Sequence, residues 1–88
     1  MVRDPLTEIE HERGRTLGWV LQRARGKRSA AEVAFRAGIS LDTLRKIERG
    51  AIATPAFFTV AALAGVLEMD LNELAHAVAL GSEKRLAS

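Results

Sequence analysis

The cationic side chains of this 88-residue sequence are concentrated in its middle. Residues 13–50 hold ten bases and three acids, a net charge of +7, whereas residues 1–12 carry −3 and residues 51–88 carry −2. Lysine and arginine neutralise phosphates and donate hydrogen bonds to base edges, so a basic segment of this kind indicates an anionic partner such as nucleic acid. The whole-chain charge of +2 conceals this arrangement.

The side chains that could support catalysis or bind a metal form no recognisable site. There is no Cys, which excludes a disulfide scaffold, a zinc-thiolate site and a thiol nucleophile. His11 and His76 lie far apart in the sequence, so we expect surface histidines rather than metal ligands. Ser29, Ser40 and Thr54 stand where helix caps are needed, and no His lies at a motif spacing beside them. We therefore expect no enzymatic activity, no metal and no cofactor.

Length and composition suit one small globular domain. Hydrophobic residues make up 48% and charged residues 27%, which is not the balance of a disordered chain. A chain of this size has little spare volume for an enclosed active site. No apolar run approaches the roughly 20 residues of a membrane span, and the start has no signal-peptide segment, so we expect a cytoplasmic protein without membrane contact.

Helix signals recur along the sequence, and no stretch alternates as a strand would. The pattern predicts an all-α fold with five helices, over about 14–25, 30–37, 41–49, 55–67 and 71–80. We expect a partly helical or flexible N-terminal extension at 1–13, the domain proper at 14–80, and a polar tail at 81–88.

Capping residues define most of the predicted helix ends. The N-terminal caps are expected at Thr7 (with Glu10), Ser29 (with Glu32), Ser40, Thr54 (followed by Pro55) and Asp70 (with Glu73). Glycines 26, 38, 50 and 81 are expected to end helices. Gly14 and Gly18 should weaken the first helix by up to about 1 kcal/mol each, which predicts a frayed start.

One face of each predicted helix is apolar. The residues expected to point inward are Leu17, Leu21, Ala24, Val33, Ala34, Ala37, Leu44, Ile47, Phe57, Val60, Ala61, Ala64, Leu67, Leu71, Leu74 and Val78. This spacing is typical of helices that pack around a single core.

The two short helices at 30–37 and 41–49 have the spacing of a helix-turn-helix. Ala37-Gly38-Ile39-Ser40 joins them, with Gly38 allowing the reversal and Ser40 capping the second helix. Leu44 and Ile47 form the inner face of that second helix. Its outer face carries Leu41, Asp42, Arg45, Lys46 and Arg49, and such a face fits the DNA major groove.

Residues 17–75 resemble the Cro/C1-type (XRE-type) helix-turn-helix family of phage and bacterial repressors. The most specific matches are the A-G-I-S turn ending at Ser40 and the I-E-R-G sequence ending at Gly50. Leu17-Gly18, Ser29 to Ala34, and Pro55 to Leu74 match as well. The resemblance implies a five-helix, lambda-repressor-like DNA-binding domain.

The resemblance also implies roles for individual residues. It places base-reading side chains at Leu41, Asp42 and Lys46, with Arg45 and Thr43 beside them. Lys46 and Arg45 can donate to guanine, Asp42 can accept from cytosine, and Leu41 can contact a thymine methyl group. Phosphate contacts are expected from Lys27, Arg28, Arg36, Thr43 and Arg49. Glu48 matches a glutamate that pairs with an arginine of the first helix, which is Arg25 by motif or Arg23 by direct counting.

The sequence departs from the family pattern at three places. Ala30 stands where many members carry a DNA-contacting Gln, the loop 51–54 has no base, and Glu68 replaces a frequent helix-ending Gly. The first two departures predict weak phosphate anchoring and a modest affinity for non-specific DNA.

Some apolar residues exceed what so small a core can hold. They are Trp19, Phe35, Ile52, Phe58, Val66 and Leu80. Exposed apolar patches mark partner surfaces, and repressors of this type usually bind DNA as dimers. We expect a homodimer through Val66, Leu71, Val78 and Leu80, or alternatively through Trp19 and Phe58.

The function that these features predict is sequence-specific binding of double-stranded DNA by a homodimeric transcriptional regulator, a repressor. One alternative is an antitoxin that represses its own operon and neutralises a toxin through its apolar surface. The other is a protein-interaction module that has kept the fold and lost DNA binding.

Overall fold

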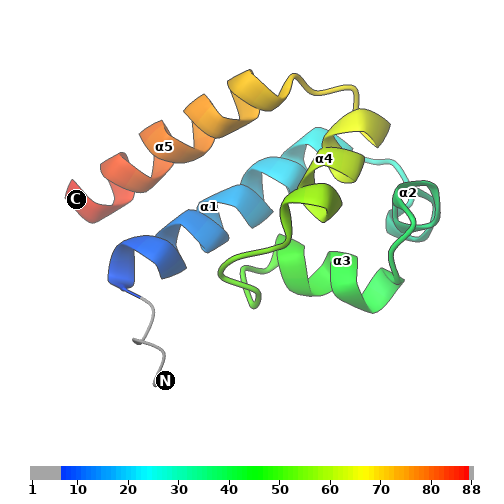
Figure 1. Ribbon diagram of the computed structural model, residues 1–88, viewed down its shortest axis with the longest axis horizontal. Helices are drawn as coiled ribbons and strands as arrows, with labels where there is room; N and C mark the ends of the chain where they lie inside the picture. Colours follow the sequence, from blue (N-terminus) through cyan, green and yellow to red (C-terminus); the bar gives the residue numbers. More distant parts are fainter. Residues whose placement is uncertain (1–6, 88) are drawn as a thin grey trace.

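The computed structural model describes residues 7–87, which form five α-helices and no strand (Figure 1). The helices are α1 (Glu8–Arg25), α2 (Ala30–Ala37), α3 (Leu41–Glu48), α4 (Phe57–Val66) and α5 (Leu71–Ala87). α1 runs through the centre, with α5 packed along one side and α3 on another, while α2 packs against α3 and α4. The predicted all-α, five-helix class is confirmed.

α1 begins earlier than the sequence predicted. The Thr7 hydroxyl accepts a hydrogen bond from the Glu10 amide at 3.2 Å. In turn, the Glu10 carboxylate accepts a hydrogen bond from the Thr7 amide. This capping box, which the sequence predicted, makes the helix continuous from Glu8, so the predicted helix start near residue 14 is wrong. Residues 1–6 of the predicted extension lie outside the described residues.

α2 and α3 follow the predicted bounds to within one residue. The Ser29 hydroxyl accepts from the Glu32 amide at 3.2 Å. The Glu32 carboxylate does not complete the predicted capping box, because it pairs with Arg36 at 3.1 Å. Ser40 caps α3 as predicted.

α4 begins two residues later than predicted. Its N-cap is Ala56, which has no capping side chain, so the expected roles of Thr54 and Pro55 are wrong. The loop before α4 packs on α1 at Ala53, whose Cα atom would lie 2.7 Å from a methyl group on Gly14. The chain therefore becomes helical only after it has crossed α1.

α5 continues to Ala87, so the predicted polar tail and the helix end at Gly81 are wrong. Ser82 is buried, and its hydroxyl bonds the Val78 carbonyl at 2.7 Å and the Thr16 hydroxyl at 3.3 Å. Gly81 packs closely on Thr16. A methyl group added to Gly81 would lie only 2.7 Å from the Thr16 methyl carbon. Contact with α1 thus keeps this glycine within the helix.

The core lies where α1, α2, α3, α4 and α5 converge. Its buried apolar members are Leu21, Val33, Ala34, Leu44, Ile47, Leu63, Ala64, Leu67 and Leu74. Phe57 and Leu71 were expected inside, but they are 64% and 40% exposed, whereas Leu63 is fully buried and was not expected. α4 has one polar residue, Thr59, so apolar periodicity cannot identify its inner face.

Three successive helices end in the same left-handed turn. Gly38 and Gly50 adopt φ of 76° after α2 and α3, and Glu68 adopts φ of 58° after α4. The amide that follows Glu68 donates to the Ala64 carbonyl at 2.8 Å, which is the Schellman pattern. Glu68 is the only residue other than glycine with positive φ in the described part of the chain.

Substituting Glu68 with glycine is expected to stabilise the protein by about 0.5–1 kcal/mol. A residue with a Cβ atom is disfavoured in this conformation by about 1–2 kcal/mol, and the greater freedom of glycine in the unfolded chain offsets part of the gain. Urea unfolding followed by circular dichroism measures the change. Glu83→Gly, in the interior of α5, is the control and should instead lose about 1 kcal/mol. A destabilised Glu68→Gly protein would contradict the prediction.

Candidate nucleic-acid interface

The turn between α2 and α3 fixes the orientation of α3. The Ser40 hydroxyl accepts from the Thr43 amide at 3.0 Å and donates to the Thr43 hydroxyl at 2.9 Å. Leu44 and Ile47 are each 1% exposed, so the inner face of α3 is held in the core. The hydroxyl hydrogen of Thr43 remains available to an external acceptor, as a phosphate contact requires.

The outer face of α3 is turned to solvent. Asp42, Arg45, Lys46 and Arg49 are exposed, and Leu41 is half-buried. The sequence predicted that four of these residues read bases and that the fifth, Arg49, contacts a phosphate. The structure therefore brings them together on one accessible face, with Leu41 and Asp42 in the first turn of α3, Arg45 and Lys46 in its last turn and Arg49 at its C-cap.

Two cations of this region are paired with an acid one helical turn earlier. Lys46 Nζ lies 3.0 Å from Asp42 Oδ2, and Arg36 Nη2 lies 3.1 Å from Glu32 Oε1. Arg45 has no ion pair with any residue that the structure describes. Its charge is therefore more available to a phosphate than those of the two paired cations.

Glu48 connects α3 to the end of α1. Its two carboxylate oxygens accept from Arg25 Nε at 2.7 Å and from Arg25 Nη2 at 3.0 Å. A third donor of the guanidinium, Nη1, bonds the Arg28 carbonyl at 2.8 Å. The hydrogen bonding of Arg25 to the Glu48 carboxylate is the main cause that raises the pKa of Arg25, so the guanidinium stays charged. Of the two partners considered from the sequence, Arg25 is the one that pairs with Glu48.

Arg23 has a different neighbour. Its guanidinium lies over the ring of Trp19, 4.9 Å from the ring centroid. Trp19 is 47% exposed, so this cation–π contact lies at the surface of α1.

Gly18 is where α1 and α3 meet, a role that the sequence analysis missed. A methyl group at Gly18 would clash with the Ile47 carbonyl oxygen and would lie 2.7 Å from that of Glu48. A methyl group on Gly14, one turn earlier, would lie 2.7 Å from the Ala53 Cα atom and carbonyl oxygen. Two glycines four positions apart lie on the same helix face, and this spacing was the signal that could have revealed the contact.

The remaining phosphate candidates lie at the start of α2. Lys27 and Arg28 are exposed in the turn before it, and Arg28 Nη2 lies 3.4 Å from the Ala24 carbonyl oxygen. Ala30 is half-buried at the first position of α2. Arg28 and Arg36 line a surface pocket together with Val66, so they lie toward α4, and the loop 51–54 contributes no cation.

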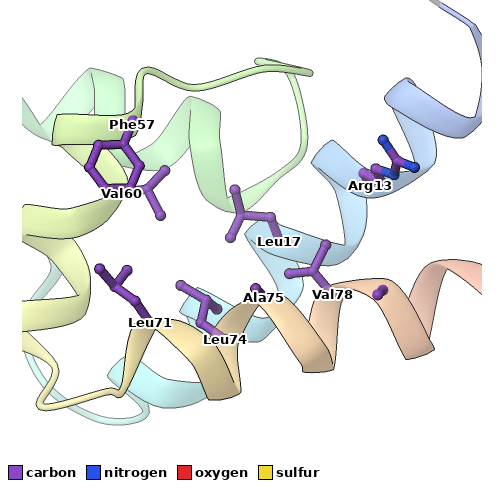
Figure 2. Close-up of a pocket in the computed structure, with 9 residues that line it drawn as sticks. Arg13, Leu17, Phe57, Val60, Leu71, Leu74, Ala75 and Val78 are labelled. Atoms are coloured by element: carbon purple, nitrogen blue, oxygen red, sulfur yellow. The ribbon is translucent and has the colours of Figure 1, made fainter.

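A second surface of the protein is apolar. A groove of about 420 Å³ lies between α1, α4 and α5, where Leu17, Val60, Leu74 and Val78 line it and Arg13 stands at one end (Figure 2). The rings of Phe57 and Phe58 meet edge to face beside it, with centroids 5.4 Å apart.

The interface candidates from the sequence are not all accessible. Phe58 is 83% exposed, and Trp19, Leu71 and Leu80 are between 40% and 47% exposed. Val66 and Val78 are half-buried. Phe57, which the sequence analysis placed in the core, belongs to the apolar surface instead.

No three His, Cys, Asp or Glu side chains among the described residues come together as metal ligands would. In the same part of the chain, no helix has the length and apolar character needed to cross a membrane.

The geometry defines an all-α domain in which a two-helix unit presents the outer face of its second helix. A family model described as a helix-turn-helix domain matches residues 16–77, which is more than half of the chain. The protein therefore belongs to this helix-turn-helix domain family, and its five helices are consistent with a lambda-repressor-like fold. A search of curated proteins found no match.

Proposed function

We propose that the protein is a Cro/C1-type (XRE-type) transcriptional repressor that binds a specific double-stranded DNA site in the cytoplasm. The observation that carries the proposal is α3 itself, whose inner face is buried while Asp42, Arg45 and Lys46 are exposed on its outer face. A single α-helix fits the major groove, where each base pair presents a distinct hydrogen-bonding pattern. Membership of the helix-turn-helix domain family supports the same function.

The placement of charge supports DNA as the partner. The segment with net charge +7 covers α1 from Arg13 onward together with α2 and α3, whereas the segment with −2 covers α4 and α5. Cations on the α2–α3 side would contact phosphates and release counterions. The loop after α3 lacks a cation, so we expect the non-specific affinity to be modest.

Selection of binding sites from random duplex DNA at physiological salt tests the proposal. We expect a recurring palindromic site, with half-sites about 34 Å apart if the protein binds as a dimer. Affinity for the selected site should fall steeply with salt concentration, because phosphate contacts depend on counterion release. Failure to enrich any sequence would contradict the proposal.

Lys46→Ala is expected to weaken binding to the selected site and to remove the preference at one or two base pairs. A lysine contact with guanine is worth about 1–3 kcal/mol of discrimination. Fluorescence anisotropy with the selected duplex and with duplexes changed at single positions measures this loss. Lys84→Ala removes an equal charge from α5 and should leave the preference intact. An equal loss on every duplex would identify Lys46 as a phosphate contact.

We also propose that the protein acts as a homodimer through the apolar surface beside the groove. Phe57, Phe58 and Leu71 are its exposed members, and Phe58 is the most exposed of them. Exposed apolar residues that lie together are typical of a protein-binding surface.

Phe58→Asp is expected to convert the dimer to monomer, since a carboxylate would be buried at the contact. Sedimentation at tens of micromolar protein measures the change. Phe35→Asp is a matched control, because Phe35 is also 83% exposed but lies on α2. A wild-type protein that sediments only as 9.6 kDa particles would contradict the dimer.

The same apolar surface supports an antitoxin, or a binding module without DNA contacts, as the second candidate. The loop without cations at 51–54 favours the module without DNA contacts, whereas the exposed apolar side chains favour the antitoxin. In an antitoxin, Phe58→Asp would abolish toxin neutralisation and Lys46→Ala would not. A module without DNA binding would enrich no duplex in the selection.

A further inference from the structure

Asp42 and Lys46 are joined before any ligand is present. Their carboxylate and ammonium groups are 3.0 Å apart on the exposed face of α3. The acid precedes the base by four residues, which is the favourable order for such a pair in a helix. Both side chains remain accessible, 72% and 46% exposed, so a ligand can reach the pair directly.

A pair of this kind contributes little to the stability of the fold, because exposed ion pairs are weak. The pair instead changes how α3 interacts with DNA. The joined groups have no net charge, so they gain little from the phosphate backbone. Asp42 alone would be repelled by phosphates, and the adjacent ammonium group allows it to lie near DNA.

The pair retains hydrogen-bonding capacity that a base pair can use. A lysine ammonium has three donors, of which one is directed at Asp42, and the second carboxylate oxygen of Asp42 is an acceptor. In the major groove, cytosine presents the N4 amino donor and guanine presents the O6 and N7 acceptors. A C·G base pair therefore complements both partners at once.

Resting on the proposed DNA binding, we propose that Asp42 and Lys46 act as one unit that selects a C·G base pair in each half-site. Asp42 accepts from cytosine N4, and Lys46 donates to guanine O6 or N7 while neutralising the carboxylate. At a base pair without the cytosine N4 donor, the Asp42 carboxylate lies in the major groove without a hydrogen-bond partner. The affinity for that DNA site is therefore lower. Asp42 is thus a specificity-determining residue.

α2 offers an internal control for the effect of charge alone. Glu32 and Arg36 form the same type of pair at 3.1 Å, with both side chains at least 60% exposed. Asp42→Asn and Glu32→Gln each remove one negative charge and free one cation. The two variants therefore differ only in whether the lost acid belongs to the outer face of α3.

The test is binding-site selection and anisotropy on the wild-type protein, Asp42→Asn, Glu32→Gln and the double variant Asp42→Asn/Lys46→Ala. We expect the wild type to prefer C·G at one position by about fivefold to 150-fold, the range of a direct base contact. Asp42→Asn should broaden the cytosine preference to admit adenine, because an amide donates as well as accepts, and Glu32→Gln should keep the preference. Both should bind random duplex about fivefold more tightly at about 0.15 M salt, if each freed cation makes one phosphate contact. The double variant should lose no more preference than Lys46→Ala alone, because coupled residues are not additive.

Two outcomes separate the inference from the proposed function. If the wild type enriches a site but Asp42→Asn keeps the same consensus, Asp42 only screens charge and the inference is wrong. If the wild type enriches no site, the proposed function is wrong and the inference falls with it. Unchanged circular dichroism spectra establish that each variant is folded.

Discussion

Replacing Gly18 by alanine is expected to destabilise the protein by about 3 kcal/mol, at the upper end of what overpacking usually costs. The new methyl group would meet the backbone carbonyls of Ile47 and Glu48, the latter at 2.7 Å. Neither carbonyl belongs to a flexible side chain, so α3 must move away from α1 to accept it. A domain of this size is stable by about 5–10 kcal/mol, so the loss is a large fraction of the total.

Urea unfolding monitored by circular dichroism measures this effect, and Gly65→Ala is the matched control. Gly65 lies within α4, and a methyl group there would meet no atom within 4 Å. Alanine at that position should therefore stabilise the protein by about 0.5–1 kcal/mol, as usual for a glycine in a helix. Equal stabilisation by both substitutions would mean that α1 and α3 are not in backbone contact at Gly18.

Glu48→Ala is the second substitution with a large expected effect, a loss of about 2–3 kcal/mol. The side chain of Arg25 is 18% exposed, and its guanidinium would lose both hydrogen bonds to the carboxylate. Removing one partner of a buried pair is costly because the remaining charge has no compensation, and partial exposure reduces the cost here. Glu32→Ala breaks an exposed pair and should lose less than about 1 kcal/mol.

Thermal and urea unfolding of the two variants provide the comparison. A change in pH is not a substitute for the mutation. The pKa of Arg25 is raised in the folded state, so its contribution to stability is complete below the unfolded pKa and is lost only as pH rises through the folded one. That window lies in strong alkali. Similar losses for Glu48→Ala and Glu32→Ala would show that the Arg25–Glu48 pair does not stabilise the fold.

Features that depend on a few neighbouring residues were predictable from the sequence. The caps at Thr7, Ser29 and Ser40 and the left-handed Gly38 are determined by local backbone hydrogen bonding. The bounds of α2 and α3 follow from them, and so does the outer face of α3. The Arg25–Glu48 pair came from the family resemblance, because spacing alone left Arg23 as an alternative.

Features that depend on distant contacts were not predictable. The start of α4 is delayed where Ala53 crosses α1, and Gly81 stays helical because it packs on Thr16. In both cases local residue preferences are overridden by packing. Gly18 was interpreted as a weakness of α1, although it permits the closest approach of α1 to α3. The Asp42–Lys46 pair was also missed, since the sequence analysis considered each residue alone.

The contact between Thr16 and Ser82 has a consequence for the order of folding. These residues are 66 positions apart in a chain of 88, so their hydrogen bond closes three quarters of the chain into one loop. The turn of the helix-turn-helix, in contrast, joins residues that are near neighbours in sequence. Because loop closure costs more entropy as the loop lengthens, local contacts form quickly and long-range contacts form late. α5 should therefore dock last and open first, while α2 and α3 are still assembled.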